Sequence, residues 1–217
     1  MTKPIGVYGG TFDPVHFGHL RVAYELYQDL GLAEVRMIPA RVPPHREAPE
    51  TPAADRADLL EAALVGQTAL RIDRRELDRP GPSYTIDTLT SLRTELGRDQ
   101  PLCLIMGGDA FAGLDQWHQW RAIVEAVHLV IAYRPGWDPH ALQGNAKALL
   151  EERGITDPTA LGARAAGSIL PWEVTQLDIS ASRIRALIAA GKEPRYLLPD
   201  AVWQLIQANG LYRTEQE

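Results

Sequence analysis

Short runs rich in apolar residues alternate with amphipathic segments along most of the chain. The apolar runs, which are typical of buried parallel strands, lie at residues 5–8, 35–39, 70–73, 102–106 and 129–133. Between them, apolar residues recur every three or four positions, which predicts helices at residues 20–30, 55–65, 84–96, 122–127 and 141–153. Gly31, Gly97 and Gly154 follow three of these segments and are typical of helix ends.

The alternation of strands with helices predicts right-handed βαβ units and a mostly parallel sheet. The fold class that we expect is therefore α/β, a Rossmann-like open parallel sheet with helices on both faces. The pattern weakens after Pro158, where we expect late strands at residues 168–171 and 173–177 and helices at 180–190 and 199–209. We interpret residues 1–217 as one domain, with a helical C-terminal segment at about 180–212 packed on it.

The composition favours an ordinary globular protein, because 45% of the 217 residues are hydrophobic and 23% are charged. No apolar run approaches the roughly 18 residues that a membrane span needs, so we expect no membrane contact and a cytoplasmic location. The formal net charge of −6 argues against a nucleic-acid partner but leaves room for a small anionic ligand. The one cysteine, Cys103, excludes an internal disulfide, and its apolar surroundings predict a buried, inert thiol.

The sequence GGTFDPVHFGH, residues 9–19, follows the first predicted strand directly. In open α/β sheets, the first strand-to-helix turn is a common phosphate site. Gly9 and Gly10 have no Cβ, so a ligand can approach their backbone closely. Asp13-Pro14 fits a helix N-cap followed by proline at the first helical position. The helix would then present free N–H groups and the positive end of its dipole to an anion.

His16 and His19 share one face of that predicted helix, on either side of Gly18, a residue that costs about 1 kcal/mol relative to alanine in a helix. Glycine at this position is understandable, despite its lower helix propensity, if a bulky group must come close to residue 18. Two histidines at a helix start are, by themselves, more often caps or packed side chains; the neighbouring glycines and the Asp-Pro pair favour a functional role. No acidic residue lies between the histidines, so we expect no protein metal site there, and the P-loop and G-x-G-x-x-G patterns are absent.

These residues resemble the signature of the H-x-G-H nucleotidylyltransferase superfamily, and more closely that of the bacterial nicotinate-nucleotide adenylyltransferase family. The narrower resemblance includes segments further along the chain: residues 43–46, 83–89, 107–109, Trp117, 134–136, 179–185 and 196–199. The chain departs from the usual I-S-S-T-x-I-R pattern of the family at Ala181 and Ser182, so no hydroxyl role is assigned to position 181. Gly108 stands where alanine is more common in the family.

The resemblance implies transfer of the adenylyl group of ATP to nicotinate mononucleotide, which gives deamido-NAD and pyrophosphate. The attacking atom is an anionic phosphate oxygen, so catalysis consists of positioning two anions and neutralising their charge. Mg²⁺ would arrive on the triphosphate. Two alternatives stay open: a sister adenylyltransferase for nicotinamide mononucleotide or phosphopantetheine, and a nucleotide-sensing module without turnover. The sequence does not decide between a monomer and a homo-oligomer.

The resemblance implies a catalytic set of His16, His19, Arg46 and Arg185, and we expect the two imidazoles to be protonated near neutral pH. The ATP side would further comprise Gly9, Gly10, Thr11, Phe12, Gly107, Asp109, Arg134, Ile179, Ser180 and Ser182. The acceptor side would comprise His45, Arg46, Tyr84, Thr85, Asp109, Trp117 and His118, with the Trp117 indole stacked on the pyridine ring. Three alternative interpretations remain: Trp117 as helix packing, Arg46 as a solvated loop charge, and Asp109 as a helix N-cap.

Overall fold

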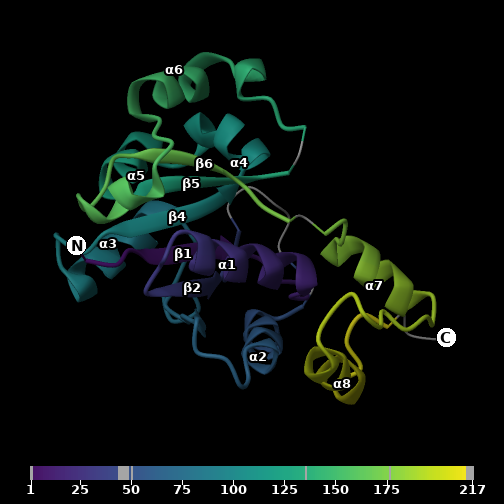
Figure 1. Cartoon of the computed structure of the whole chain (residues 1–217). Coiled ribbons are helices and arrows are strands. Elements are labelled where there is room, and N and C mark those ends of the chain that lie inside the picture. The colour runs from purple at the N-terminus through teal and green to yellow at the C-terminus, as the bar shows by residue number, and fades with distance from the viewer. Residues whose placement is uncertain (1, 44–48, 50, 135, 176, 214–217) are drawn as a thin grey trace.

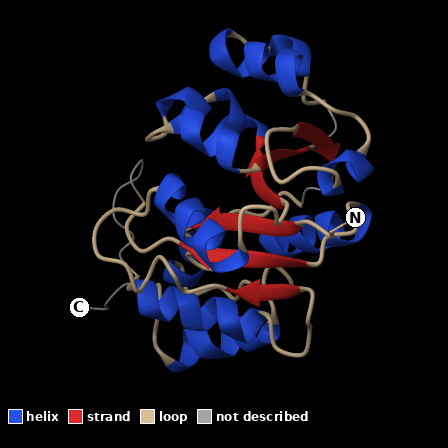
Figure 2. Cartoon of the chain, turned by 90° about the vertical axis from the view of Figure 1, so that its left-hand side faces the viewer, coloured by secondary structure: helices blue, strands red, loops and turns tan. Residues whose placement is uncertain are grey.

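A single parallel sheet organises the molecule. The computed structural model describes residues 2–43, 49, 51–134, 136–175 and 177–213. Within these residues the sheet has six strands in the order β3-β2-β1-β4-β5-β6, and every neighbouring pair is parallel (Figures 1 and 2). The strands are β1 (Ile5–Gly10), β2 (Glu34–Pro39), β3 (Leu70–Ile72), β4 (Leu102–Gly107), β5 (His128–Tyr133) and β6 (Ile169–Glu173). The predicted α/β class with an open parallel sheet is confirmed.

Seven of the eight helices in the described residues lie where the apolar pattern predicts a helix, to within a few residues, whereas that pattern predicts none at Gly108–Ala112. The helices are α1 (Phe17–Asp29), α2 (Ala53–Ala63), α3 (Thr85–Leu96), α4 (Gly108–Ala112), α5 (Trp120–Ala126), α6 (Gly144–Arg153), α7 (Ala181–Ala189) and α8 (Asp200–Ala208). Three short 3₁₀ turns lie at Leu114–Gln116, Pro139–Ala141 and Pro158–Gly162. In the described part of the chain, no helix is both long enough and apolar enough to cross a membrane.

The second late strand, predicted at residues 173–177, is wrong. The ladder of β6 with β5 ends where the Val174 N–H donates to the Tyr133 carbonyl at 2.9 Å. Beyond that bond, the described residues as far as Ser180 are neither strand nor helix. Apolar composition alone cannot make a strand, because a strand also needs a neighbour that satisfies its backbone groups.

The sheet has an apolar cluster on each face, which explains why its strands are apolar almost throughout. Side chains alternate along β4, so that Cys103 and Ile105 pack with α1, α2, α7 and α8, whereas Leu102, Leu104 and Met106 pack with α3, α4, α5 and α6. Cys103 is fully buried, and burial raises the pKa of its thiol to about 12. This thiol is therefore inert, as predicted.

The two C-terminal helices stand at the lower right of Figure 1, beside α1 and α2. Ile184 and Ile188 of α7 and Trp203 of α8 are buried in the same cluster as Leu59 and Leu60 of α2. This shared core holds α7 next to the carboxyl end of β1. The organisation of residues 1–217 as one domain stays a prediction.

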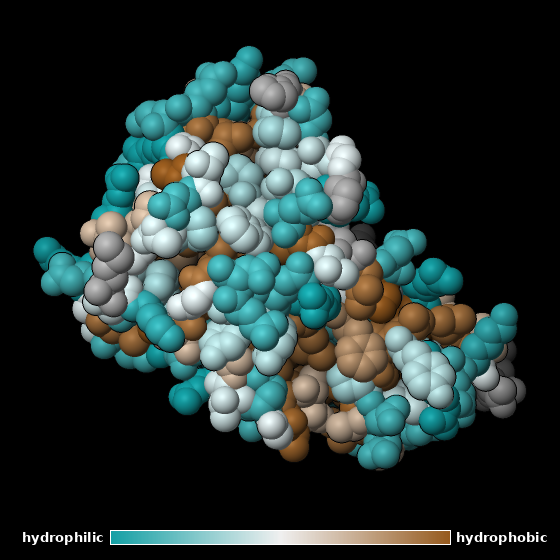
Figure 3. Space-filling model, in the orientation of Figure 1, coloured by the Kyte–Doolittle hydropathy of each residue, from teal (hydrophilic) through white to brown (hydrophobic). Residues whose placement is uncertain are grey.

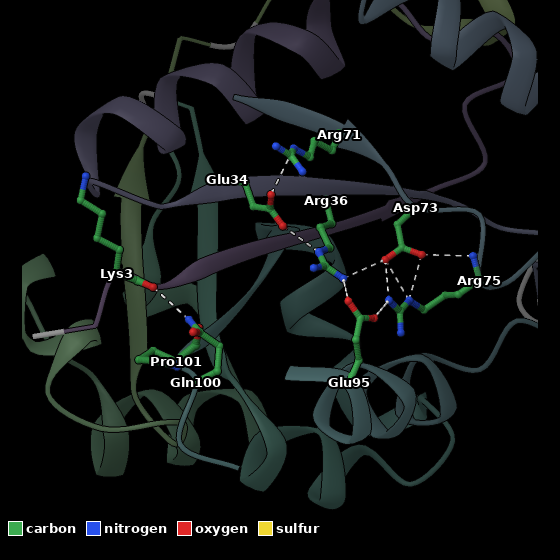
Figure 4. Close-up of polar contacts among 9 residues, drawn as sticks. All are labelled: Lys3, Glu34, Arg36, Arg71, Asp73, Arg75, Glu95, Gln100 and Pro101. Atoms are coloured by element: carbon green, nitrogen blue, oxygen red, sulfur yellow. Dashed lines mark hydrogen bonds and ion pairs between the residues drawn. The ribbon is translucent and has the colours of Figure 1, made fainter. Parts of the chain in front are cut away.

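A network of ion pairs joins β2 and the chain after β3 to α3 (Figure 4). The Arg36 guanidinium on β2 lies 2.8 Å from Glu34 and 2.8 Å from Glu95 of α3. The Arg75 guanidinium lies 2.7 Å from Asp73 and 2.6 Å from the same Glu95. Because Arg36 and Arg75 are 16% and 13% exposed, these pairs are screened less than fully solvated ones. They fix the second half of α3, whose first turn borders the candidate site.

Replacement of Arg36 by glutamine should lower the free energy of unfolding by about 1–2 kcal/mol, because Glu34 and Glu95 each lose a partly buried cation. Urea denaturation monitored by circular dichroism measures the loss. The matched control is Arg74→Gln, whose ion pairs with Asp58 and Glu61 are solvent-exposed and should contribute no more than about 0.5 kcal/mol. Equal effects of the two substitutions would contradict a role for the network.

Candidate active site

The main cleft lies at the carboxyl ends of β1 and β4, the neighbouring strands at which the strand order reverses. It has a volume of about 690 Å³, which is within the usual range for a small-molecule site. Gly9 and Gly10 at the end of β1 and Gly107 at the end of β4 line it. Ligands of open α/β sheets bind at this kind of reversal point.

The glycines of this cleft serve two different purposes. A Cβ on Gly10 would lie 2.9 Å from the ring of Phe12, so residue 10 must be small to admit that ring. Phe12 itself has a positive φ of 49° and is buried. By contrast, a Cβ on Gly9 or Gly107 would meet no atom within 4 Å. These two glycines therefore border open space in the cleft and present bare backbone there.

The first helix begins later than the Asp13-Pro14 pair predicts. Its first residue is Phe17 and its N-cap is His16, which makes no side-chain capping hydrogen bond. The prediction that Asp13 caps this helix with Pro14 at its first position is therefore wrong. The Asp13 carboxylate instead accepts a hydrogen bond of 2.7 Å from the Tyr212 hydroxyl, near the other end of the chain.

His16 and His19 stack on each other, with ring centroids 3.7 Å apart. The Phe12 ring packs edge-on against His19 at 5.1 Å. A Cβ on Gly18 would lie 3.0 Å from the His16 ring, so the bulky group beside residue 18 is the His16 imidazole. The Nδ1 atom of each histidine is buried without a hydrogen-bond partner among the described residues, which leaves Nε2 as the nitrogen that a ligand can reach.

The two imidazoles are neutral in the free protein. Burial lowers the pKa of His16 to about 4 and that of His19 to about 3, and any charge on His16 lowers the pKa of His19 further. The expectation that both rings are protonated near neutral pH is therefore wrong for the ligand-free site. A neutral imidazole still donates one N–H, and an anion bound beside it would raise its pKa.

Arg185 on α7 reaches the turn that contains the histidines. Its Nη1 donates to the Asp13 carbonyl at 2.6 Å and lies 3.8 Å from the Asp13 carboxylate. At the start of the same helix, Ser180 is the N-cap, and its hydroxyl accepts the Arg183 N–H at 3.3 Å. The Ser182 hydroxyl lies 3.2 Å from that of Ser180.

These groups line a second cleft of about 420 Å³, which contains His16, His19, Ile179, Ser180, Ser182 and Arg185. Tyr8, His19, Ala181 and Arg185 line both clefts, so the two are continuous. In Figure 3, apolar groups reach the surface where α1 approaches α7. Leu177, which precedes α7, is one of the exposed apolar residues and lines the second cleft.

Three of the residues predicted for the acceptor line the main cleft, whereas Tyr84 and His118 line neither cleft among the described residues. Thr85, the first residue of α3, lines the cleft together with Asp109 and Trp117. The Tyr84 and His118 rings pack at 4.4 Å. Asp109 is the second residue of α4, and Gly107 is the N-cap of that helix, so the alternative interpretation of Asp109 as an N-cap is wrong.

Some predicted residues are not brought to the cleft. Arg134 is exposed beyond the end of β5 and lines neither cleft as the described residues define them. His45 and Arg46 lie outside the described residues. Pro43 and Pro49, the described residues closest to them on either side, both line the main cleft.

Comparison with known proteins assigns the chain to a family. Residues 7–187 match the cytidylyltransferase-like family. The chain is also 49% identical over 209 residues to the "Probable nicotinate-nucleotide adenylyltransferase" of Methylococcus capsulatus, covering 96% of this chain and 99% of that protein. The chain belongs to the nicotinate-nucleotide adenylyltransferase family.

Further family members agree with this assignment. The protein of the same name from Pseudomonas aeruginosa is 46% identical over 213 residues, with 98% of this chain and 99% of that protein covered. Among solved structures, the Plasmodium falciparum nicotinic acid mononucleotide adenylyltransferase complexed with NaAD matches with a TM-score of 0.70. The match covers 97% of both chains at 17% identity, so it shows that the fold is shared.

Arg56 supports the turn beside the main cleft, although it lines neither cleft, and the sequence interpretation missed it. The guanidinium, only 1% exposed, donates to the carbonyl oxygens of Thr11 at 2.5 Å, Ala40 at 2.7 Å and Thr51 at 3.2 Å. It thus holds the turn after β1 against the end of β2. The spacing offered a signal, because Arg56 lies three and four positions before the buried Leu59 and Leu60, on the apolar face of α2.

No group of three or more His, Cys, Asp or Glu side chains in the described ranges is arranged to hold a metal ion. The second cleft is instead lined by imidazoles, hydroxyls and the Arg185 guanidinium, and these groups suit anionic oxygens, whereas the carboxylates of Asp13, Glu76 and Asp109 line the main cleft.

Because of the histidine pair, we expect the free energy of unfolding to decrease as the pH falls. In an unfolded chain the histidine pKa is near 6.5, whereas the folded values are about 4 for His16 and about 3 for His19. Below about pH 6.5 the unfolded state therefore binds more protons, and each histidine should lower the free energy of unfolding by about 1 kcal/mol per pH unit. This contribution is fully present above pH 7 and is lost progressively toward pH 4.

Urea unfolding of the protein and of His16→Asn, between about pH 7.5 and 5, measures the effect. The variant should show a shallower dependence of stability on pH, by about 1 kcal/mol per unit. Identical slopes would contradict a depressed histidine pKa.

Proposed function

We infer that this protein transfers the adenylyl group of ATP to nicotinate mononucleotide, giving deamido-NAD and pyrophosphate. The observation that carries this inference is near full-length identity of 46–49% to proteins that bear the name of this activity. The site supports it independently, because imidazoles, a guanidinium and bare glycine backbone from distant parts of the chain line continuous clefts.

The chemistry needs two anions to meet in a protein of net charge −6. A phosphate oxygen of the acceptor attacks the α-phosphorus of ATP, and the bond from that phosphorus to the oxygen bridging it to the β-phosphate breaks as pyrophosphate leaves. His16 and His19 donate to the triphosphate, with His19 nearest the reacting phosphorus. The incoming negative charge raises the imidazole pKa, so a proton is taken up with the substrate and neutralises charge that moves onto pyrophosphate.

The start of α7 supports a site for the β- and γ-phosphates. The Ser180 and Ser182 hydroxyls, the first N–H groups of the helix and Arg185 lie together beside the second cleft. The bond from Arg185 to the Asp13 carbonyl orients the guanidinium and uses only one of its donors. Mg²⁺ enters with ATP, bound through the substrate's phosphates.

The opposite side of the main cleft supports a site for the nicotinate end of the acceptor. N–H groups near Thr85 and His118 bind the pyridine carboxylate, and the Trp117 indole stacks on the ring. Asp109 accepts hydrogen bonds from ribose hydroxyls. His45 and Arg46 complete the acceptor side. A cytoplasmic location agrees with a reaction that consumes ATP.

A pyrophosphate-release assay with ATP, Mg²⁺ and each candidate acceptor tests the function. Nicotinate mononucleotide should be the preferred acceptor. Absence of turnover with every acceptor would contradict an enzymatic role and favour a nucleotide sensor. Turnover of nicotinamide mononucleotide or phosphopantetheine at least as fast as that of the acid would overturn the acceptor assignment.

His19→Ala should lower kcat by about 10²–10³-fold with little change in the acceptor KM, because the imidazole acts on charge that develops in the transition state. Steady-state pyrophosphate release measures both constants. The control is Arg21→Ala on the same helix, which removes an ion pair with Glu25; neither residue lines a cleft, so both constants should stay unchanged. An unchanged kcat for His19→Ala would remove His19 from catalysis.

Trp117→Ala should raise the acceptor KM by about tenfold and leave the ATP KM within about twofold, because loss of a stacked ring costs about 1 kcal/mol or more. Trp120→Ala is the matched control, since Trp120 contacts Arg121 on α5 and does not line the cleft. A normal acceptor KM in Trp117→Ala would refute the stacking.

A further inference from the structure

A buried carboxylate lies at the acceptor side of the cleft, where no role above requires it. Glu76 follows β3, is 8% exposed and lines the main cleft with Ser83, Thr85 and Thr88. Its Oε1 accepts a hydrogen bond of 2.6 Å from the Thr88 hydroxyl, and the Ser83 hydroxyl, which lines the same cleft, is a second hydroxyl that lowers the pKa of the carboxylate. A buried carboxylate loses hydration and repels two anionic substrates. We therefore expect a structural role of Glu76 that offsets this electrostatic cost.

The Ser83 hydroxyl connects Glu76 to the loop that follows β2. Its oxygen accepts the Arg41 N–H at 2.9 Å and the Val42 N–H at 3.4 Å, which occupies its lone pairs. The Ser83 N–H in turn donates to the Val42 carbonyl at 3.0 Å. The one hydroxyl hydrogen of Ser83 is therefore directed to the Glu76 carboxylate.

Thr88 is oriented in the same way from the other side. Its oxygen accepts a hydrogen bond of 3.2 Å from Arg79, whose guanidinium also lies 3.4 Å from the Tyr84 carbonyl. The hydroxyl hydrogen of Thr88 goes to Glu76 at 2.6 Å, because the other acceptor within reach, the Tyr84 carbonyl, is 3.5 Å away. Burial raises the pKa of Glu76, while the hydrogen bonds from Thr88 and Ser83 and the charge of Arg79 oppose that rise.

We propose that Glu76 is a positioning residue, which locks the first turn of α3 to the loop after β2 and so presets the acceptor side of the cleft. Thr85 lies between the two residues, Ser83 and Thr88, that the carboxylate holds. Arg41 and Val42, to which Ser83 bonds, directly precede Pro43, which lines the main cleft. This inference deepens the proposed function and rests on it.

A carboxylate is the side-chain group suited to this position. It accepts two hydroxyl hydrogens at once and carries no donor of its own. In Glu76→Gln, an amide oxygen that accepts from Thr88 leaves the amide NH₂ facing the Ser83 hydroxyl, whose oxygen already accepts the Arg41 and Val42 N–H groups. One of the two connections is therefore lost, although the side chain keeps its size.

The experiment compares acceptor and ATP kinetics of the protein with those of Glu76→Gln and Glu76→Asp. Glu76→Gln should raise the KM for nicotinate mononucleotide about tenfold or more, while the KM for ATP stays within about twofold. Glu76→Asp keeps both acceptor oxygens on a shorter side chain and should recover part of the loss. Glu34→Gln, in the ion-pair network of Figure 4, is the matched control and should leave both KM values unchanged.

Two results would overturn the inference. One is a Glu76→Gln variant with a lower Tm but equal changes in the two KM values, since loss of fold stability alone predicts no split between the substrates. The other is an unchanged acceptor KM. If the unmodified protein does not use nicotinate mononucleotide, the proposed function fails, and hydrogen exchange then decides the positioning role. Glu76→Gln must accelerate exchange of the Arg41 and Ser83 amides, whose bonds depend on the Ser83 hydroxyl and its loop; unchanged exchange refutes the proposal.

Discussion

The site depends on how the turn after β1 is held in place. Three side chains from distant parts of the chain bind its backbone or its one carboxylate: Arg56 of α2 binds the Thr11 carbonyl, Arg185 of α7 binds the Asp13 carbonyl, and Tyr212 binds the Asp13 carboxylate. Each bond closes a long loop of chain. The turn can therefore take this shape only when α2, α7 and the C-terminal residues are packed on the sheet.

The packing of this turn explains why the two histidines of the site are neutral. The packed turn buries His16 and stacks it on His19, and burial keeps both imidazoles neutral. Two charged rings with centroids 3.7 Å apart would repel each other strongly in so desolvated a position. The two imidazoles therefore carry no positive charge before substrate binds. In the proposed reaction, positive charge would appear there when a phosphate binds beside the imidazoles and raises their pKa.

The sequence predicts the strands and helices well, because both faces of the sheet are covered and the apolar pattern of each element reflects that burial directly. It also predicts that the glycine-rich turn and the segment at Ser180 serve one ligand, although only through the family resemblance. It fails at Asp13, where local chemistry favours an N-cap but a tyrosine about 200 residues away provides a stronger partner. It fails at residues 173–177, where no neighbouring strand is available, and it misses Arg56 and Glu76, whose roles arise only from tertiary contacts.

The residue type at position 108, which departs from the family pattern, also depends on a contact with a distant part of the chain. Gly108 stands where alanine is more common, a change that looks minor in the sequence. In the structure, a Cβ at residue 108 would lie 2.5 Å from Nε1 of Trp137, which stacks on Tyr133 at 4.9 Å. The glycine therefore admits an indole from the segment after β5, and an alanine there would require Trp137 to move. The side chain that fits at position 108 therefore depends on where the Trp137 indole lies, and the two residues must be considered together.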